Sequence, residues 1–252
     1  TLKTVALDGK AGLYWSSATG GLGWTIGGYN IGRSSTSGGP YTYDSVGNVT
    51  NAVTSSLLNN LTNGTTYYFV VRAEDRLGNS VATSSEVSVT PIANRYHAYL
   101  QTFATASATS TTLLNSNGTS AFCDIPADAL SSGINLNTDF YSISEDAVVS
   151  SKPLPSGKLG ANTFYELSFY KQSDLTQVTS LDKMVPITFT YTDSDITGID
   201  ESTLTAYRWN GSSWSAISGS SVNTSTNTVN ISTSNFGSFT LLGTAPASTP
   251  AP

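Results

Sequence analysis

The acidic segment at residues 193–201 has the residue types and spacing closest to a metal-binding chemistry. Its nine residues include four carboxylates, Asp193, Asp195, Asp200 and Glu201. Carboxylate oxygens are preferred ligands of Ca²⁺, and the EF-hand loop D-x-[DN]-x-[DN]-G-x5-E places them at alternate positions before a glycine. This segment is therefore the first candidate for a calcium site.

The match to the calcium loop fails at its twelfth position. Aspartates occupy the first and third positions and Gly198 the sixth, but Thr197 stands at the fifth and Leu204 at the twelfth. The twelfth residue should be the glutamate that binds Ca²⁺ through both oxygens. We therefore predict a helical turn with carboxylates at its N-terminus, where the helix dipole favours them. An irregular oxygen-rich calcium site is the alternative; the prediction is no metal and no cofactor.

Catalysis has few candidate residues in this chain. The single histidine, His97, lies between Tyr96 and Ala98, and a histidine acting as a general base needs an oriented partner within hydrogen-bond reach. No such partner is recognisable in the sequence. Paired carboxylates could serve a glycosidase, but the acidic residues stand mostly in turn-like positions. We predict that the protein is not an enzyme and has no catalytic residues.

Trp209 and Trp214 flank a predicted hairpin at residues 210–213, which begins with Asn-Gly. Two tryptophans on neighbouring strands could form a platform on which a sugar stacks. Cross-strand aromatic pairs more commonly cover part of a hydrophobic core. We favour the core and keep the sugar platform as the alternative.

Cys123 is the only cysteine, so no disulfide forms within the chain. A free cysteine is most simply a small buried hydrophobic residue. N-x-[ST] acceptor sequences for N-glycosylation occur at Asn48, Asn60, Asn63, Asn117, Asn210, Asn223 and Asn230. Several of them fall in predicted turns, where a glycan has room, and the chain is a candidate glycoprotein.

The composition indicates an extracellular protein. Charged residues make up 11% of the 252 residues, against roughly 25% in a typical soluble domain. Residues 1–94 carry five basic and five acidic side chains, and residues 95–252 carry six and twelve. Since no basic stripe exists, nucleic acid is not a predicted partner. No apolar run approaches the roughly 20 residues of a membrane-spanning helix. The first residue is Thr1 and not Met, which indicates processing or excision from a longer chain.

Residues 61–73 form the clearest strand signal. An Asn-Gly turn precedes a run of aromatic and β-branched residues. Alternation places one set of side chains on one face: Tyr67, Phe69, Val71 and Ala73. A tyrosine at the start of such a strand can fold its hydroxyl back onto the preceding turn, which is the tyrosine corner of immunoglobulin-like sandwiches. The segment resembles the fibronectin type III module.

Other segments of residues 1–91 fit the same module. Strands are predicted at residues 1–7, 13–15, 26–33 and around Val87 and Val89. A turn at residues 38–41 resembles the usual link to the next strand. The resemblance implies a binding or spacer module without an active site.

A linker is predicted at residues 92–96, after Pro91 ends the last strand. Residues 97–243 are predicted to form a second sandwich. The segment at residues 121–133, with Ile125-Pro126 and Ala129-Leu130, resembles immunoglobulin-like modules of large bacterial secreted and cell-surface proteins. In those modules a strand ends at the proline and a short helical turn follows. Residues 244–252 form a tail rich in Pro, Ala, Ser and Thr.

The later strands of the second module are predicted at residues 164–169, 184–191, 204–209 and 236–243, with a further hairpin around residues 224–227. The predicted fold is therefore all-β, with two immunoglobulin-like β-sandwich domains in tandem. The predicted function is a non-enzymatic extracellular structural subunit of a prokaryotic surface layer, sheath or filament. Its partner would be a second copy of the chain. The alternative is an adhesion or accessory module that binds cell-surface polysaccharide within a larger secreted protein.

Overall fold

The computed structural model describes residues 1–19, 25–43, 49–50, 54–93, 95–104, 106–114, 118–130, 135–143 and 148–247. Asn48, Asn117, part of the glycine-rich loop and the end of the tail lie outside these ranges. The chain divides into two compact units, the first comprising Thr1–Ala93 with Tyr170–Thr176 and the second Asn94–Phe169 with Gln177–Pro252. The domain boundaries at residues 92–96 and 243–244 stay a prediction.

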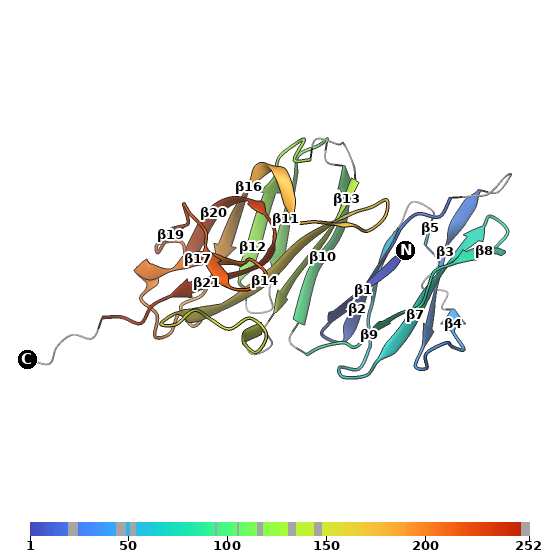
Figure 1. Cartoon of the computed structure of the whole chain (residues 1–252), viewed down its shortest axis with the longest axis horizontal. Coiled ribbons are helices and arrows are strands. Elements are labelled where there is room, and N and C mark those ends of the chain that lie inside the picture. Colours follow the sequence, from blue (N-terminus) through green and yellow to red (C-terminus); the bar gives the residue numbers. More distant parts are fainter. Residues whose placement is uncertain are drawn as a thin grey trace, which may run out of the picture. The chain divides into compact units, whose positions relative to one another are not determined.

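The described residues of the first unit form nine strands (Figure 1): β1 (Leu2–Leu7), β2 (Lys10–Trp15), β3 (Ile26–Ser34), β4 (Thr42–Tyr43), β5 (Val49–Thr50), β6 (Ser55–Leu58), β7 (Tyr67–Asp75), β8 (Ser80–Thr83) and β9 (Val87–Val89). One sheet has the order β1-β2-β6. The other has the order β4-β3-β7-β8, with β5 paired to β3 and β9 to β7. The strand pairings described in this unit are antiparallel, as expected for a sandwich.

Alternation along the strands builds the core between these two sheets. Leu13 and Trp15 of β2 face Tyr29 of β3 and Phe69 and Val71 of β7 in one buried cluster. The intervening residues of β7 form a mixed face, because Val70 is buried while Arg72 is half-buried. The predicted inward face of this strand is confirmed. Such two-sided burial by antiparallel sheets defines a β-sandwich.

The tyrosine corner is present at the start of β7. The backbone N–H of Thr62 donates to the Tyr67 hydroxyl oxygen at 3.0 Å. This hydrogen bond lowers the pKa of the Tyr67 hydroxyl below its ordinary value. Asn63 joins the same turn to the first hairpin, because its Oδ1 accepts from Gly9 N at 2.8 Å. These two hydrogen bonds therefore connect the turn at residues 62–63 to the start of β7 and to the hairpin between β1 and β2.

Tyr67→Phe is expected to lower the denaturation midpoint of the first unit while leaving its fold intact. The substitution keeps the ring and leaves the Thr62 N–H without its acceptor. Chemical denaturation followed by circular dichroism measures the effect, with Tyr68→Phe on the next residue of β7 as the matched control. Equal midpoints for Tyr67→Phe and the parent protein would show that the corner adds no stability.

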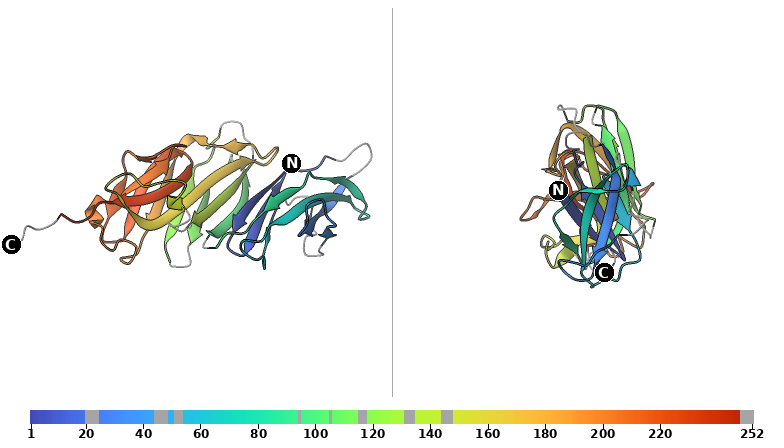
Figure 2. Two further views of the ribbon diagram at one scale, coloured as in Figure 1. Left: turned by 60° about the horizontal axis from the view of Figure 1, so that its bottom comes forward. Right: turned by 90° about the vertical axis from the view of Figure 1, so that its right-hand side faces the viewer.

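The second unit also contains two sheets, seen as layers in Figures 1 and 2. Its strands are β10 (Arg95–Ala104), β11 (Thr109–Leu114), β12 (Ser120–Ile125), β13 (Asn135–Ile143), β14 (Leu159–Lys171), β15 (Gln177–Val178), β16 (Ser180–Thr190), β17 (Thr205–Trp209), β18 (Trp214–Ala216), β19 (Ser221–Asn223), β20 (Thr228–Asn235) and β21 (Gly237–Gly243). The orders are β10-β13-β14-β21-β17-β18, with β15 paired to β14, and β11-β12-β16-β20-β19.

Aromatic side chains from both sheets meet in the core of the second unit. Tyr165 of β14 stacks on Phe189 of β16 with ring centroids 5.4 Å apart. Phe239 of β21 lies 6.0 Å from Phe189, and Phe236 packs edge-on against Phe169 at 4.6 Å. Each of these five rings is at most 4% exposed. The all-β prediction of tandem immunoglobulin-like sandwiches is confirmed by these sheets and cores.

Two local predictions for the second unit are wrong in detail. Strand β12 ends at Ile125 before Pro126 as expected, but a turn with Asp128 at φ 53° takes the place of the short helical turn. A left-handed residue of this kind interrupts a right-handed helix. The strand predicted at residues 184–191 extends back to Ser180, so Pro186 lies inside β16. The pairing of β16 with β12 covers only Ile187 to Phe189, so proline stands beyond that ladder.

Candidate functional site

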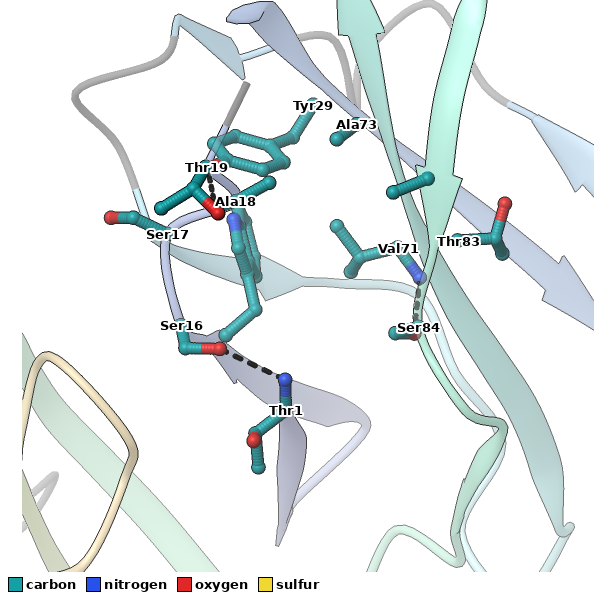
Figure 3. Close-up of a pocket in the computed structure, with 12 residues that line it drawn as sticks. Thr1, Ser16, Ser17, Ala18, Thr19, Tyr29, Val71, Ala73, Thr83 and Ser84 are labelled. Atoms are coloured by element: carbon teal, nitrogen blue, oxygen red, sulfur yellow. Dashed lines mark hydrogen bonds between the residues drawn. The ribbon is translucent and has the colours of Figure 1, made fainter. Parts of the chain in front are cut away.

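A cavity of about 310 Å³ lies in the first unit, where the loop after β2 meets β3, β7 and β8. Figure 3 shows Tyr29 and Ala18 on one side and Val71 and Ser84 on another. The lining is complete with Thr1, Trp15, Ser16, Ser17, Thr19, Ala73, Ala82 and Thr83. Pockets of at least about 300 Å³ lined by apolar and neutral polar groups are typical small-ligand sites.

Trp15 is the largest side chain of this cavity. Alternation along β2 turns it inward, where its ring lies edge-on to Tyr29 with centroids 5.6 Å apart. Only 2% of Trp15 is exposed. Its Nε1–H is buried and has no hydrogen-bond partner among the residues that the structure describes. Indole N–H groups usually find a partner when buried, so this donor needs an explanation.

Hydrogen bonds from the backbone hold the hydroxyl groups of Tyr29 and Ser84 in place at the cavity. The Tyr29 hydroxyl oxygen accepts from Ala18 N at 2.7 Å, which fixes the loop after β2. The Ser84 hydroxyl accepts from Val71 N at 3.0 Å and donates to the Ser85 carbonyl at 2.9 Å. Ser84 is therefore fully engaged, whereas the hydrogen of the Tyr29 hydroxyl remains available to donate.

The side chains that line the cavity are uncharged, and the amino group of Thr1, which donates to Ser16 Oγ at 2.8 Å, is the charged group of its lining. Its lining contains no Asp, Glu, Lys, Arg, His or Cys side chain. General acid–base or nucleophilic catalysis of the usual kinds needs such groups. The arrangement is suited to binding an uncharged molecule through hydrogen bonds and apolar contacts. The sequence predicted the strands at residues 13–15 and 26–33, which contain Trp15 and Tyr29, but not the cavity, because no local pattern reveals empty space between sheets.

The aspartates of the acidic segment are held by neighbouring donors. Asp195 is buried, and its Oδ2 accepts from Thr192 N at 2.9 Å and from Thr192 Oγ1 at 2.6 Å. Asp200 caps the short 3₁₀ helix η2 (Glu201–Thr203) by accepting from Ser202 N at 3.0 Å. The predicted helical turn with carboxylates at its N-terminus is confirmed for Asp200 and Glu201, whereas Asp193 and Asp195 lie in a separate turn before it.

The other two carboxylates of the segment also accept hydrogen bonds. Asn227 Nδ2 donates to Asp193 Oδ1 at 2.9 Å, and the Tyr191 hydroxyl donates to Glu201 Oε1 at 2.8 Å. Burial, followed by the Glu201 carboxylate, raises the pKa of the Tyr191 hydroxyl. Over the described ranges, no group of three or more His, Cys, Asp or Glu residues is placed to hold a metal ion.

Trp209 and Trp214 are paired across the β17–β18 hairpin. Their ring centroids lie 5.5 Å apart at an interplanar angle of 68°. Trp214 is buried against Phe164 and Val148, and its Nε1 donates to the Lys152 carbonyl at 3.0 Å. The two rings therefore cover a small core, as favoured, and do not form a flat exposed platform.

A hydrogen-bond network joins Lys152, Glu166 and Ser238, which the sequence did not predict. Lys152 Nζ donates to the Ser238 hydroxyl, which in turn donates to Glu166 Oε2. Ser168 donates to Glu166 Oε1 at 3.0 Å, and Lys152 Nζ lies 3.7 Å from Glu166 Oε2. Glu166 and Ser238 are register partners on β14 and β21. The pairing of Glu166 with Ser238 across two strands would have revealed the network, but alternation within one strand does not predict which residues pair.

The Ser238 hydroxyl lies between the Lys152 ammonium and the Glu166 carboxylate, an arrangement that resembles a serine activated as a nucleophile. The cavity at Trp15 does not border it, and neither does a second cavity lined by Arg33 and Tyr67. The Lys152 and Glu166 side chains are 25% and 14% exposed. A partly buried ion pair with its hydrogen bonds satisfied is sufficient to explain the arrangement.

The remaining candidate residues are placed as follows. His97 lies on β10, where its backbone is opposite Tyr141 of β13. Cys123 is fully buried in the core of the second unit, and burial raises the pKa of its thiol, as expected for an inert cysteine. The five glycosylation asparagines in the described ranges are all exposed: Asn60, Asn63, Asn210, Asn223 and Asn230. Glycosylation stays a prediction.

Comparisons with known proteins give a coarse likeness. No protein-family model matches the chain, and no curated protein matches it. The crystal structure of the chicken CNTN1 FN1-FN3 domains is similar, with 10% identity, a TM-score of 0.30, and coverage of 97% of this chain and 87% of that one. The twitchin kinase region from C. elegans has 13% identity and a TM-score of 0.32, over 91% of this chain and 38% of that one.

The fold itself is fibronectin type III/immunoglobulin-like. That statement rests on the facing antiparallel sheets, the alternating core and the tyrosine corner. In the part of the chain that the structure describes, no helix has the length and apolar character needed to cross a membrane.

Proposed function

We propose that the chain is a non-enzymatic extracellular structural subunit of a prokaryotic surface layer, sheath or filament, and that it self-associates through its sheet edges. One observation carries the proposal. The strands at the ends of the four sheets are β1, β6, β4, β8, β10, β18, β11 and β19. Lys3 and Arg95 are the only Lys, Arg, Asp or Glu residues in these strands, and none of their residues is proline.

Sheet edges with few charges favour association. Natural monomers usually block such edges with Lys, Pro or bulges, because the unpaired N–H and C=O groups of an edge can pair with another chain. Strand addition across two copies would supply main-chain hydrogen bonds. A head-to-tail contact that does not close generates a filament. The small number of charges also weakens long-range repulsion between copies.

The test is the mass in solution as the protein concentration rises, under native salt and divalent-ion conditions. We expect multiples of the 26.4 kDa chain. Val81→Lys on β8 and Thr112→Lys on β11 place a charge at exposed edge positions and are expected to shift the mass toward the monomer. Thr224→Lys, in the exposed turn after β19, is the matched control. Removing residues 1–7 is less informative, since Leu2 and Leu7 belong to the core.

A monomeric parent protein at every concentration would end the structural-subunit proposal. Equal association of the edge variants and the parent would end the edge mechanism. The second candidate function is an adhesion or polysaccharide-binding accessory module of a larger secreted protein. The cavity at Trp15 favours it, because hydroxyl groups and aromatic rings line this cavity.

A further inference from the structure

We propose that the second cavity of the first unit, at Arg33 and Tyr67, binds a sugar residue that carries one negative charge, as in a polysaccharide of uronic acids or sugar sulfates. This inference rests on the second candidate function and names its class of polysaccharide. The cavity has a volume of about 590 Å³, within the range of small-ligand sites. It is lined by Arg33, Ser34, Ser35, Thr36, Pro40, Thr42, Asn60 and Tyr67.

The register of β3 and β7 brings Arg33 and Tyr67 to the same face, at the end of one strand and the start of the other. Arg33 is opposite Phe69, and Tyr67 lies two residues before Phe69 on the same face of β7. Arg33 and Tyr67 are therefore diagonal neighbours, a spacing within the reach of long side chains. The hydrogen bond from Thr62 lowers the pKa of the Tyr67 hydroxyl, and the Arg33 charge lowers it further.

The Arg33 guanidinium is accessible to a ligand. Its side chain is exposed, and the ion pairs described in this chain, Arg72–Glu74 and Lys152–Glu166, do not include it. Among the described residues that line the cavity, it is the only charged side chain. A guanidinium presents a planar fork of N–H donors that pairs with two oxygens of one anionic group. The cavity therefore favours a ligand with a single negative charge.

Exposed polar groups complete the lining. Ser35, Thr36 and Thr42 carry hydroxyls, and all three residues are exposed. Asn60 adds an exposed amide. Hydroxyls and amides both donate and accept hydrogen bonds, which the hydroxyls of a sugar ring also require. Pro40 is exposed in the same lining, and its ring offers an apolar surface for the C–H groups of a sugar.

The loop after β3, at residues 35–41, forms one wall of the cavity and is held by Glu86, which is not part of the lining. The Glu86 carboxylate accepts from Ser37 Oγ at 2.8 Å and from Gly38 N at 2.9 Å. The Tyr41 hydroxyl donates to the same carboxylate. These hydrogen bonds fix the loop within the protein, so that binding requires less ordering of this wall. Both oxygens of Glu86 are engaged by the loop.

Other small ligands match the lining less well. An uncharged sugar leaves the Arg33 guanidinium without an anionic partner, and a doubly charged phosphate exceeds the single positive charge of the lining. Residues 1–94 carry five basic and five acidic side chains, so the summed charge of this segment does not repel one negative charge. A singly charged sugar uses both the guanidinium and the hydroxyls.

The experiment follows the Arg33 Nε–H and the backbone amides of Ser35 and Thr36 in ¹H–¹⁵N NMR spectra of the full chain. The chain has five arginines, and the Arg33 signal is identified by its loss in Arg33→Gln. Glucuronate and glucose 6-sulfate are titrated beside glucose, which lacks the charge, and propionate, which lacks the sugar ring. We expect saturable shifts with a charged sugar and weaker binding of glucose and propionate. The charged sugar that binds more tightly identifies the anionic group.

Three variants and a control test the residues. Arg33→Gln removes the charge at an exposed position, and about tenfold weaker binding is expected from the loss of a charge-assisted hydrogen bond. Arg33→Lys keeps the charge without the planar fork, so its affinity is expected between those of the parent and Arg33→Gln. Ser35→Leu places an apolar side chain in the lining and is expected to abolish the shifts. Arg76→Gln, in the exposed turn after β7, is the matched control, with affinity unchanged.

Polysaccharides separate this inference from the proposals on which it builds. The full chain is expected to be retained by immobilised polygalacturonate or dextran sulfate and not by dextran. Retention by dextran, without binding of either charged sugar, would overturn the inference and leave the second candidate function in place. None of these measurements bears on the solution mass, which tests the structural-subunit proposal.

Four other results would overturn the proposal. No saturable shift with either charged sugar would end it, and so would binding of glucose as tight as that of the charged sugars. Binding of propionate as tight as that of glucuronate would show that the site recognises carboxylates in general, including those of peptides. Unchanged affinity in both Arg33→Gln and Ser35→Leu, or an equal loss in Arg33→Gln and Arg76→Gln, would place the binding elsewhere on the chain.

Discussion

Phe189→Ala is expected to lower the free energy of unfolding of the second unit by about 3–5 kcal/mol, the range for removing a buried phenylalanine. Phe189 is 1% exposed and lies between the rings of Tyr165 and Phe239 from the opposite sheet. Truncation removes both ring contacts and leaves a cavity that rigid sheets close only in part. Chemical denaturation followed by near-ultraviolet circular dichroism measures the loss.

Phe122→Ala is the matched control for this prediction. Phe122 lies on the neighbouring strand β12 but faces away from the core, with 40% of its surface exposed. Surface substitutions of this kind usually change stability by about 0.5 kcal/mol or less. A loss in Phe122→Ala as large as in Phe189→Ala would mean that the inward and outward faces of this sheet are assigned wrongly.

Alternation was enough to predict the inward face of β7. On β7, Phe69, Val71 and Ala73 are all core residues, because successive side chains of a strand point to opposite faces and only one face meets the other sheet. The Asn-Gly turn before Trp214 and the corner at Tyr67 were also readable, since both depend on residues close in sequence. Local chemistry thus predicted these two turns, whereas β14 and β16 begin at Leu159 and Ser180, several residues before their predicted starts at residues 164 and 184.

Features that depend on the register between strands, or on a cavity between packed elements, could not be predicted from the sequence. The Lys152–Glu166–Ser238 network requires that Glu166 lie opposite Ser238, and these residues are far apart in the chain. A one-residue slip would place them on opposite faces. The cavity at Trp15 is lined by residues of five separate segments, and the sequence of each segment is that of an ordinary strand or loop. Only the assembled sandwich shows that the Trp15 donor is left without a partner in the described residues.

Trp214→Ala is expected to destabilise the second unit by about 3–5 kcal/mol, as for other buried aromatic side chains. Trp214 is 6% exposed and packs against Phe164 with centroids 6.0 Å apart. The substitution also removes the Nε1–H that the Lys152 carbonyl accepts. Thermal or chemical denaturation measures the loss, and binding of sugars to the second unit is measured in parallel.

Trp209→Ala separates a core role of this hairpin from a sugar platform. Trp209 is half-buried and covers Trp214 from outside, so its removal is expected to cost less stability than the loss of Trp214. If the pair were a sugar platform, Trp209→Ala would weaken sugar binding more than Trp214→Ala, because the more exposed ring would make the stacking contact. Retention of a soluble polysaccharide by the parent protein, lost in Trp209→Ala without a change in the denaturation midpoint, would establish the platform. A smaller loss of stability in Trp209→Ala than in Trp214→Ala, with sugar binding unaffected by Trp209→Ala, would establish that the pair covers the core formed by Phe164 and Val148.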